Sequence, residues 1–204
     1  MKISTALEQM LDLGLHIVAP ATARDRTESP AYEVLSSEGE VELRRYAAQI
    51  VAETTATGTK SEVDDDLFPR LAAYIFASER DGPEIDMTTP VQLAPEGLSV
   101  TDDPTGAEAY TMRFVMPAEW TIDTLPRPRD PRVSIREVPA RTVAVLSFKG
   151  AATDEVLRSK AAALRAHVAA QGWTADGAVE FASYDPPVTP APFKLHEVRI
   201  AVAD

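Results

Sequence analysis

The chain has 204 residues and contains no cysteine. Disulfides, thiolate metal sites, iron–sulfur clusters and cysteine nucleophiles are therefore excluded. Positive charge is also scarce: 20 Lys and Arg stand against 32 Asp and Glu, which gives a formal net charge of −12. Nucleic acids and anionic membrane surfaces are bound through concentrated basic patches, so this balance argues against both as partners.

Long hydrophobic runs are missing as well. No stretch reaches the length that is needed to cross a bilayer, so we expect no transmembrane segment. Residues 1–23 resemble a secretory signal only in part, because Glu8 and Asp12 interrupt the apolar stretch and Lys2 is its one Lys or Arg. We therefore expect a cytoplasmic protein.

Familiar catalytic and metal-binding motifs are absent too. The sequence has no GxSxG elbow, no phosphate-binding glycine loop, no dinucleotide fingerprint and no HExxH pair. The histidines, His16, His167 and His196, lie far apart and lack paired ligand spacing, so we expect no zinc-type metal site.

One pattern occurs twice. Residues 41–58 align with residues 133–150 at an offset of 92 positions, without a gap. The identical pairs are Val41 and Val133, Arg44 and Arg136, Ala48 and Ala140, Val51 and Val143, Ala52 and Ala144, and Gly58 and Gly150. A duplicated unit commonly packs about a pseudo-twofold axis, and the seam between the copies is then a ready place for a cleft.

The periodicity of apolar residues predicts more strands than helices. Strands are expected near 32–35, 41–46, 49–57, 86–94, 110–116, 133–138, 141–148, 179–184 and 195–202. One helix is expected to start at Ser61, with Asp64 three residues later. Another is expected to run from Thr153 to about Gln171, where Gly172 ends it, with an apolar stripe of Leu157, Ala161, Leu164 and Val168. Each half reads β-β-α-β-β, which predicts an α+β fold with a largely antiparallel sheet.

The first 30 residues differ from the rest of the chain. An apolar stripe along residues 3–18 predicts an amphipathic N-terminal helix, and residues 21–30 form a polar linker. The stripe is expected to dock on the domain or to mediate self-association or binding of a protein partner. The domain proper would span 31–204, with halves of about 31–117 and 133–204.

Four strings of residues resemble a known family. They are YEVLSSEGEVELRRY (32–46), DMTTPV (86–91), RFVMP (113–117) and YDPPVTPAPFKLHEVRI (184–200). In order and spacing they are similar to the SOUL haem-binding family over the whole domain. The resemblance implies a distorted antiparallel barrel of two βαββ-type halves, flanked by two helices. It also implies non-catalytic binding, buffering or delivery of haem or a related tetrapyrrole in an apolar cleft.

The resemblance places the cleft between the first helix of the domain and the loop before the last strand. The residues that it assigns to the cleft are Phe68, Leu71, Ala72, Ile75, Met87, Met116, Tyr184, Pro186, Pro187 and Phe193. The chain departs from the family where some members carry an axial histidine, here Arg45, or basic propionate partners, here Asp65 and a position near Thr189. Replacement candidates are His167 and His196 as axial ligands, and Arg70, Lys194 and Arg199 as propionate partners.

Two alternatives belong to other classes. The two-half architecture also resembles GyrI-like small-molecule-binding domains, some of which hydrolyse ligands with a glutamate and a tyrosine; degradation of haem is a variant of this enzyme hypothesis. The candidate catalytic residues would be Glu180, Glu197, Tyr74 and Tyr184. The second alternative is an interaction module that works through the N-terminal helix. We expect a carrier rather than an enzyme.

Overall fold

The computed structural model describes residues 27–78 and 80–203, so the predicted helix at 3–18 lies outside the described residues. The strands are β1 (Tyr32–Glu38), β2 (Val41–Tyr46), β3 (Gln49–Thr57), β4 (Val91–Pro95), β5 (Ala109–Val115), β6 (Ser134–Val138), β7 (Arg141–Lys149), β8 (Glu180–Ser183) and β9 (Leu195–Val202). The helices are α3 (Lys60–Ile75), α4 (Asp154–Ala170) and the short 3₁₀ helix η2 (Ala191–Phe193). The fold is α+β, as the sequence predicts.

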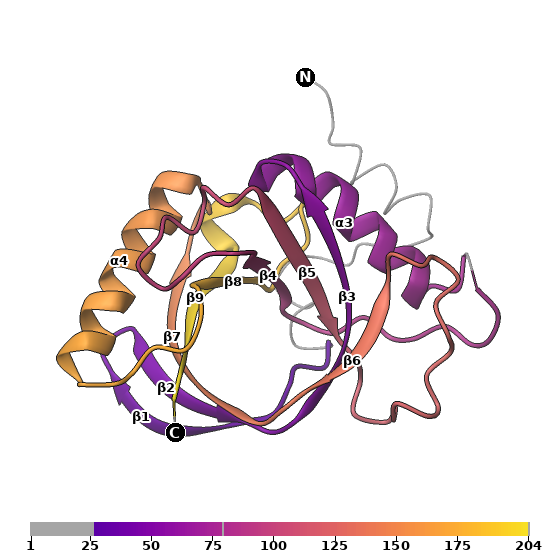
Figure 1. Cartoon of the computed structure of the whole chain (residues 1–204), viewed down its shortest axis with the longest axis horizontal. Coiled ribbons are helices and arrows are strands. Elements are labelled where there is room, and N and C mark those ends of the chain that lie inside the picture. The colour runs from indigo at the N-terminus through magenta and orange to yellow at the C-terminus, as the bar shows by residue number, and fades with distance from the viewer. Residues whose placement is uncertain (1–26, 79, 204) are drawn as a thin grey trace.

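All nine strands join one curled sheet, in which each pair of named strands is antiparallel. The two long helices lie on the outer side of the curl (Figure 1). Helix α3 packs on β3 and β5, and α4 packs on β9 and β7. None of the helices in the described part of the chain is long and apolar enough to cross a membrane.

The strand order is β1-β2-β7-β9-β8-β4-β5-β3-β6. From β2 to β6 this order is symmetric about the β8–β4 contact, with β2 matching β6, β7 matching β3, and β9 matching β5. The offset of 92 positions relates β2 to β6 and β3 to β7 in the same way. This is the strand order that two related halves would give, although descent from a duplicated unit stays a prediction. Strand β2 pairs with β7 of the other half rather than with β3.

Helix α3 begins earlier than predicted. Its N-cap is Thr59, whose backbone N–H donates to Glu62 Oε2 at 2.9 Å, so the start at Ser61 is wrong by two residues. The Glu62 carboxylate satisfies an N–H that no helical carbonyl can reach. Helix α4 starts at the predicted cap, Thr153, and ends at Gln171. Its buried residues are those expected from the sequence, Leu157, Ala161, Leu164 and Val168.

Strand β4 is shorter than predicted, because residues 86–90 do not join the sheet ladder. Pro90 has no N–H to donate, and the peptide bond between Thr89 and Pro90 is cis. Thr88 instead donates through Oγ1 to the Val115 carbonyl at 2.6 Å. The segment therefore crosses beside β5 before the ladder starts at Val91.

The main core lies between the helices and the sheet and draws on both halves of the chain. A second, small cluster of Tyr46, Val143 and Val145 lies on the other face of the sheet. Strand β7 is consequently buried on both faces: Ala144 and Leu146 join the main core, while Val143 and Val145 join the small one. Both sides of the sheet are thus available for buried side chains.

Candidate functional site

A cavity of about 440 Å³ lies where α3 crosses the middle of the sheet. It spans the β8–β4 contact, which is the symmetry point of the strand order. The walls are mostly apolar and come from α3, from four strands and from the loop after β8. The principal wall residues are Phe68, Ala72, Phe76, Val91, Leu93, Met112 and Phe181.

The wall that α3 provides is a single row of side chains. Lys60, Asp64, Phe68, Ala72 and Phe76 all line the cavity and are spaced four residues apart. Residues at this spacing lie one above another on a helix face. The row is charged at its N-terminal end and apolar along the rest. With Asp65 beside the row, the helix contributes three charged side chains to the cavity next to an apolar wall.

The cavity contains six of the ten residues that the family resemblance assigned to a cleft. They are Phe68, Ala72, Met87, Tyr184, Pro186 and Pro187. Leu71, Ile75 and Met116 are instead buried in the core and do not line the cavity. Phe193 lies outside the cavity and is 67% exposed.

Of the two candidate axial histidines, His196 lines the cavity. Its Nδ1 lies 3.0 Å from Ser183 Oγ, across the β8–β9 ladder. Burial, and then the charge of Lys194, lower the pKa of His196 below its ordinary value. His167 lies near the C-terminal end of α4, outside the cavity, where its ring contacts the Trp173 ring edge-on.

Of the candidate propionate partners, one lines the cavity and two lie outside it. Lys194 lines the cavity, and so does Lys60, which is not among the residues predicted from the sequence. Arg70 does not, because its guanidinium is held by Thr54 and Asp66. Arg199 belongs to an ion network on the other face of the sheet. Lys60 lies four residues before Asp64 and eight before Phe68, on the same helix face, and this spacing is the signal that could have identified it.

Two of the positions at which the chain departs from the family are also placed. Asp65 lines the cavity, together with Asp64 and Asp185, so its rim carries acidic as well as basic groups. Arg45 is exposed on β2, and β7 and β9 separate that strand from β8. The cavity therefore takes no contribution from the position that carries an axial histidine in some family members.

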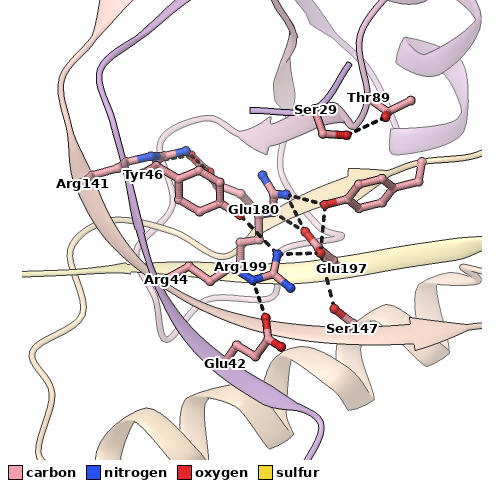
Figure 2. A network of polar contacts seen from close by, with 11 residues as sticks. Ser29, Glu42, Arg44, Tyr46, Thr89, Arg141, Ser147, Glu180, Glu197 and Arg199 are labelled. Atoms are coloured by element: carbon pink, nitrogen blue, oxygen red, sulfur yellow. Dashed lines mark hydrogen bonds and ion pairs between the residues drawn. The ribbon is translucent and has the colours of Figure 1, made fainter. Parts of the chain in front are cut away.

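The ion network on the opposite face of the sheet centres on Glu197 (Figure 2). Arg44 Nη1 donates to its Oε1 at 2.9 Å, and Arg199 Nε donates to its Oε2 at 2.8 Å. The Tyr184 hydroxyl donates to Oε1 at 2.9 Å. The side chains of Arg44, Glu197 and Arg199 are 6%, 2% and 3% exposed. Each charge in this buried trio thus has a partner of opposite sign.

This network defines what Glu197 and Tyr184 can do chemically. Burial alone would raise the pKa of Glu197, but the charges of Arg199 and Arg44 outweigh it and hold that pKa below the ordinary value. Burial is also the main reason that the pKa of Tyr184 is well above 10. Glu197 is therefore a stabilised carboxylate with low basicity, and Tyr184 keeps its proton.

The other two residues of the enzyme hypothesis lie elsewhere. Glu180 accepts from Arg141 and Arg113 at 2.9 and 3.1 Å, on the same face of the sheet as Glu197. The Tyr74 hydroxyl donates to the Pro126 carbonyl at 2.8 Å. The structure thus brings together Glu197 and Tyr184 of the four candidates.

The sequence matches the family model described as SOUL heme-binding protein over residues 27–201. The chain belongs to the SOUL family. Membership supports binding of haem or another tetrapyrrole in general, and it agrees with the resemblance carried by the four strings. A comparison with curated proteins gives no match.

Solved structures of similar fold are distant in sequence. The C-terminal domain of EcmrR superposes with a TM-score of 0.62 at 13% identity, covering 85% of this chain and 98% of that one. A hydrolase from Listeria innocua gives 0.56 at 11% identity, covering 83% and 94%. The EcmrR chain in a complex with DNA gives 0.61 at 12% identity, covering 98% and 65%. At these identities the likeness shows the fold alone.

Proposed function

We propose that this SOUL-family chain is a cytoplasmic carrier that binds haem or a related tetrapyrrole in the cavity between α3 and β8. Its role would be to buffer or deliver the pigment without changing it chemically. The observation that carries the proposal is the apolar cavity at the symmetry point of the sheet, in a chain whose family is haem-binding.

The size and lining of the cavity fit such a ligand. Its volume of about 440 Å³ lies within the usual range for small-molecule sites. Phe68, Phe76 and Phe181 supply aromatic surface against which a flat macrocycle can pack. Burying roughly 300 Å² of apolar ligand surface is worth about 7 kcal/mol before the cost of ordering is subtracted.

The polar groups at the cavity suit the charged edge of the macrocycle. Lys194 and Lys60 both line the cavity and are the cations available to propionates there. Lys60 already donates to Asp64 at 3.0 Å, whereas Lys194 has no ion-pair partner among residues 27–78 and 80–203. In this arrangement Lys194 is the principal anchor, the aromatic walls exclude water, and Pro186 and Pro187 limit the movement of the loop. When bound, haem would supply its redox-active iron.

The contact between Tyr184 and Glu197 is the observation that bears on the hydrolase alternative. A general base needs a lone pair that is free to take up a proton. Both carboxylate oxygens of Glu197 accept hydrogen bonds from arginines, so the pair lacks such a base. A carrier accordingly agrees with the geometry better than a hydrolase that uses Glu197 and Tyr184 does.

Titration of the purified full-length chain with ferric haem and with free-base protoporphyrin tests the proposal. We expect a saturable shift of the Soret band with haem and quenching of tryptophan fluorescence with either ligand, at micromolar concentrations. The variant Ala72→Phe, which fills the cavity with a ring, serves as the matched control. If the folded wild-type chain gives no saturable response with either ligand, the proposed function is wrong.

A further inference from the structure

The ring of His196 has one nitrogen whose hydrogen bonding is not satisfied. The residue is 7% exposed and forms part of the cavity wall. Its Nε2 is buried and has no hydrogen-bond partner among the described residues. A buried polar atom without a partner costs free energy, and such atoms are rare in folded proteins. An atom of this kind in a cavity wall calls for a functional explanation.

The other ring nitrogen is held in place. His196 Nδ1 lies 3.0 Å from Ser183 Oγ, and the Phe148 ring packs beside the imidazole with its centroid 5.5 Å away. When Nδ1 carries the proton and donates it to Ser183, the lone pair lies on Nε2. Histidines that ligate metals generally have this arrangement, in which a hydrogen bond to the second nitrogen sets tautomer and orientation.

We infer that Nε2 of His196 is the protein ligand of the iron when haem occupies the cavity. This inference rests on the proposed function and adds a selectivity: iron porphyrin should bind more tightly than the metal-free macrocycle. The described residues contain no group of three or more ligating side chains, so the porphyrin nitrogens would complete the coordination.

A purely structural role is the competing explanation, because a hydrogen bond with the backbone of Gly150 acts to raise the pKa of His196, so the backbone lies close enough to interact with the ring. The two accounts differ in what they predict for iron. A structural histidine would affect the binding of haem and of free-base protoporphyrin equally. An iron ligand would affect haem alone.

The experiment compares ferric haem with free-base protoporphyrin, using the full chain and the variants His196→Gly and His167→Ala. We expect wild type to bind ferric haem at least about tenfold more tightly than the free base. In His196→Gly this preference should vanish and the ferric Soret band should move, while free-base affinity stays within about twofold. Added imidazole should restore the wild-type band. His167→Ala should behave as wild type, because His167 lies outside the cavity.

The outcomes separate the inference from the proposed function. Equal affinity of wild type for the two ligands, or a ferric Soret band that His196→Gly leaves unchanged, overturns ligation by His196 while the carrier function stands. If neither ligand binds to wild type, both are overturned. Should His196→Gly fail to fold, the wild-type preference decides. The variant Ser183→Ala then provides a second test, because it removes the hydrogen bond to His196 Nδ1. We expect it to lower the affinity for haem by about tenfold and to leave the affinity for the free base unchanged.

Discussion

Neighbouring residues of β9 face two different environments. The His196 side chain lies in the apolar cavity on the helix side of the sheet, and the Glu197 side chain lies in the ion network on the other side. Successive side chains of a strand point to opposite faces, so one short segment supplies both. The same holds on β8, where Phe181 lines the cavity and Glu180 lies on the side of the ion network. We call that side of the sheet, with Glu197 and Glu180 and their arginine partners, the charged face.

The two faces differ in how completely their polar groups are paired. On the charged face, Glu197 lies between two arginines, Glu180 contacts Arg141 and Arg113, and Glu53 contacts Arg113 and Arg136. In the cavity, Lys194 has no ion-pair partner and His196 Nε2 has no hydrogen-bond partner within the described part of the chain. The charged groups on the first face are thus paired with one another, whereas the cavity holds two polar groups that a ligand could pair with.

The largest effect is expected from Glu197→Ala. The substitution leaves Arg44 and Arg199 buried without their counter-charge, which should lower the free energy of unfolding by about 3–5 kcal/mol. Urea denaturation followed by circular dichroism measures it. Glu137→Ala, on an exposed site of β6, is the control and should change stability by under about 0.5 kcal/mol. A loss below about 1 kcal/mol for Glu197→Ala would mean that the network contributes little to stability.

Lowering the pH should reduce the stability that the ion pairs of the charged face contribute. Burial alone would raise the pKa of Glu180, but the charge and hydrogen bond of Arg141, together with the charges of Arg113 and Arg199, outweigh it, so the pKa lies below 4.5 in the folded chain. The unfolded chain therefore takes up this proton first as the pH falls. The contribution of Glu180 is complete above pH 4.5 and is lost as the pH falls towards its folded pKa, by at most about 1.4 kcal/mol per pH unit.

Urea unfolding between about pH 3 and pH 5 measures this dependence. Glu180→Gln removes the titrating group, so its stability should fall less steeply with decreasing pH than that of wild type. Equal slopes would show that Glu180 has the same pKa in the folded and unfolded chain.

A substitution in the cavity wall should act mainly on the affinity for the tetrapyrrole. Ala72→Phe places a ring in the middle of the α3 wall and should reduce tetrapyrrole affinity by at least about tenfold, with a loss of stability of about 1–3 kcal/mol because Ala72 is buried. Fluorescence quenching and thermal unfolding measure the two effects. The control is Ala162→Phe on the exposed side of α4. Retained affinity in a folded Ala72→Phe chain would place the ligand elsewhere.

The sequence predicted the local features of this fold well. Strand alternation, the Thr153 cap and the apolar stripe of α4 depend on residues that are close together in the chain, and the structure has each of them. The start of α3 was harder to predict, because Thr59 with Glu62 and Ser61 with Asp64 both match a capping pattern. Patterns of this kind do not reveal which of two neighbouring caps is used.

The site required information that the linear pattern lacks. Leu71 and Phe68 both belong to the apolar stripe of α3, yet Leu71 packs in the core and Phe68 lines the cavity. That difference depends on how the sheet curves beneath the helix. The Arg44–Glu197 pair likewise depends on β2 lying beside β7 rather than β3, a pairing between residues that are 153 positions apart. Local periodicity carries no record of such non-local pairings.

The smallest predicted effect concerns the unpaired cation of the cavity. Lys194→Gln should weaken haem binding by about 0.5–1 kcal/mol at low ionic strength, and the difference should shrink as salt is added. Arg45→Gln removes the same charge from exposed β2 and should have less effect on binding. The dimethyl ester of protoporphyrin provides a matched ligand without propionate charge, so Lys194→Gln should bind it as wild type does. An equal loss of affinity for the acid and for the ester would show that Lys194 acts through packing of its carbon chain and not through an ion pair with a propionate.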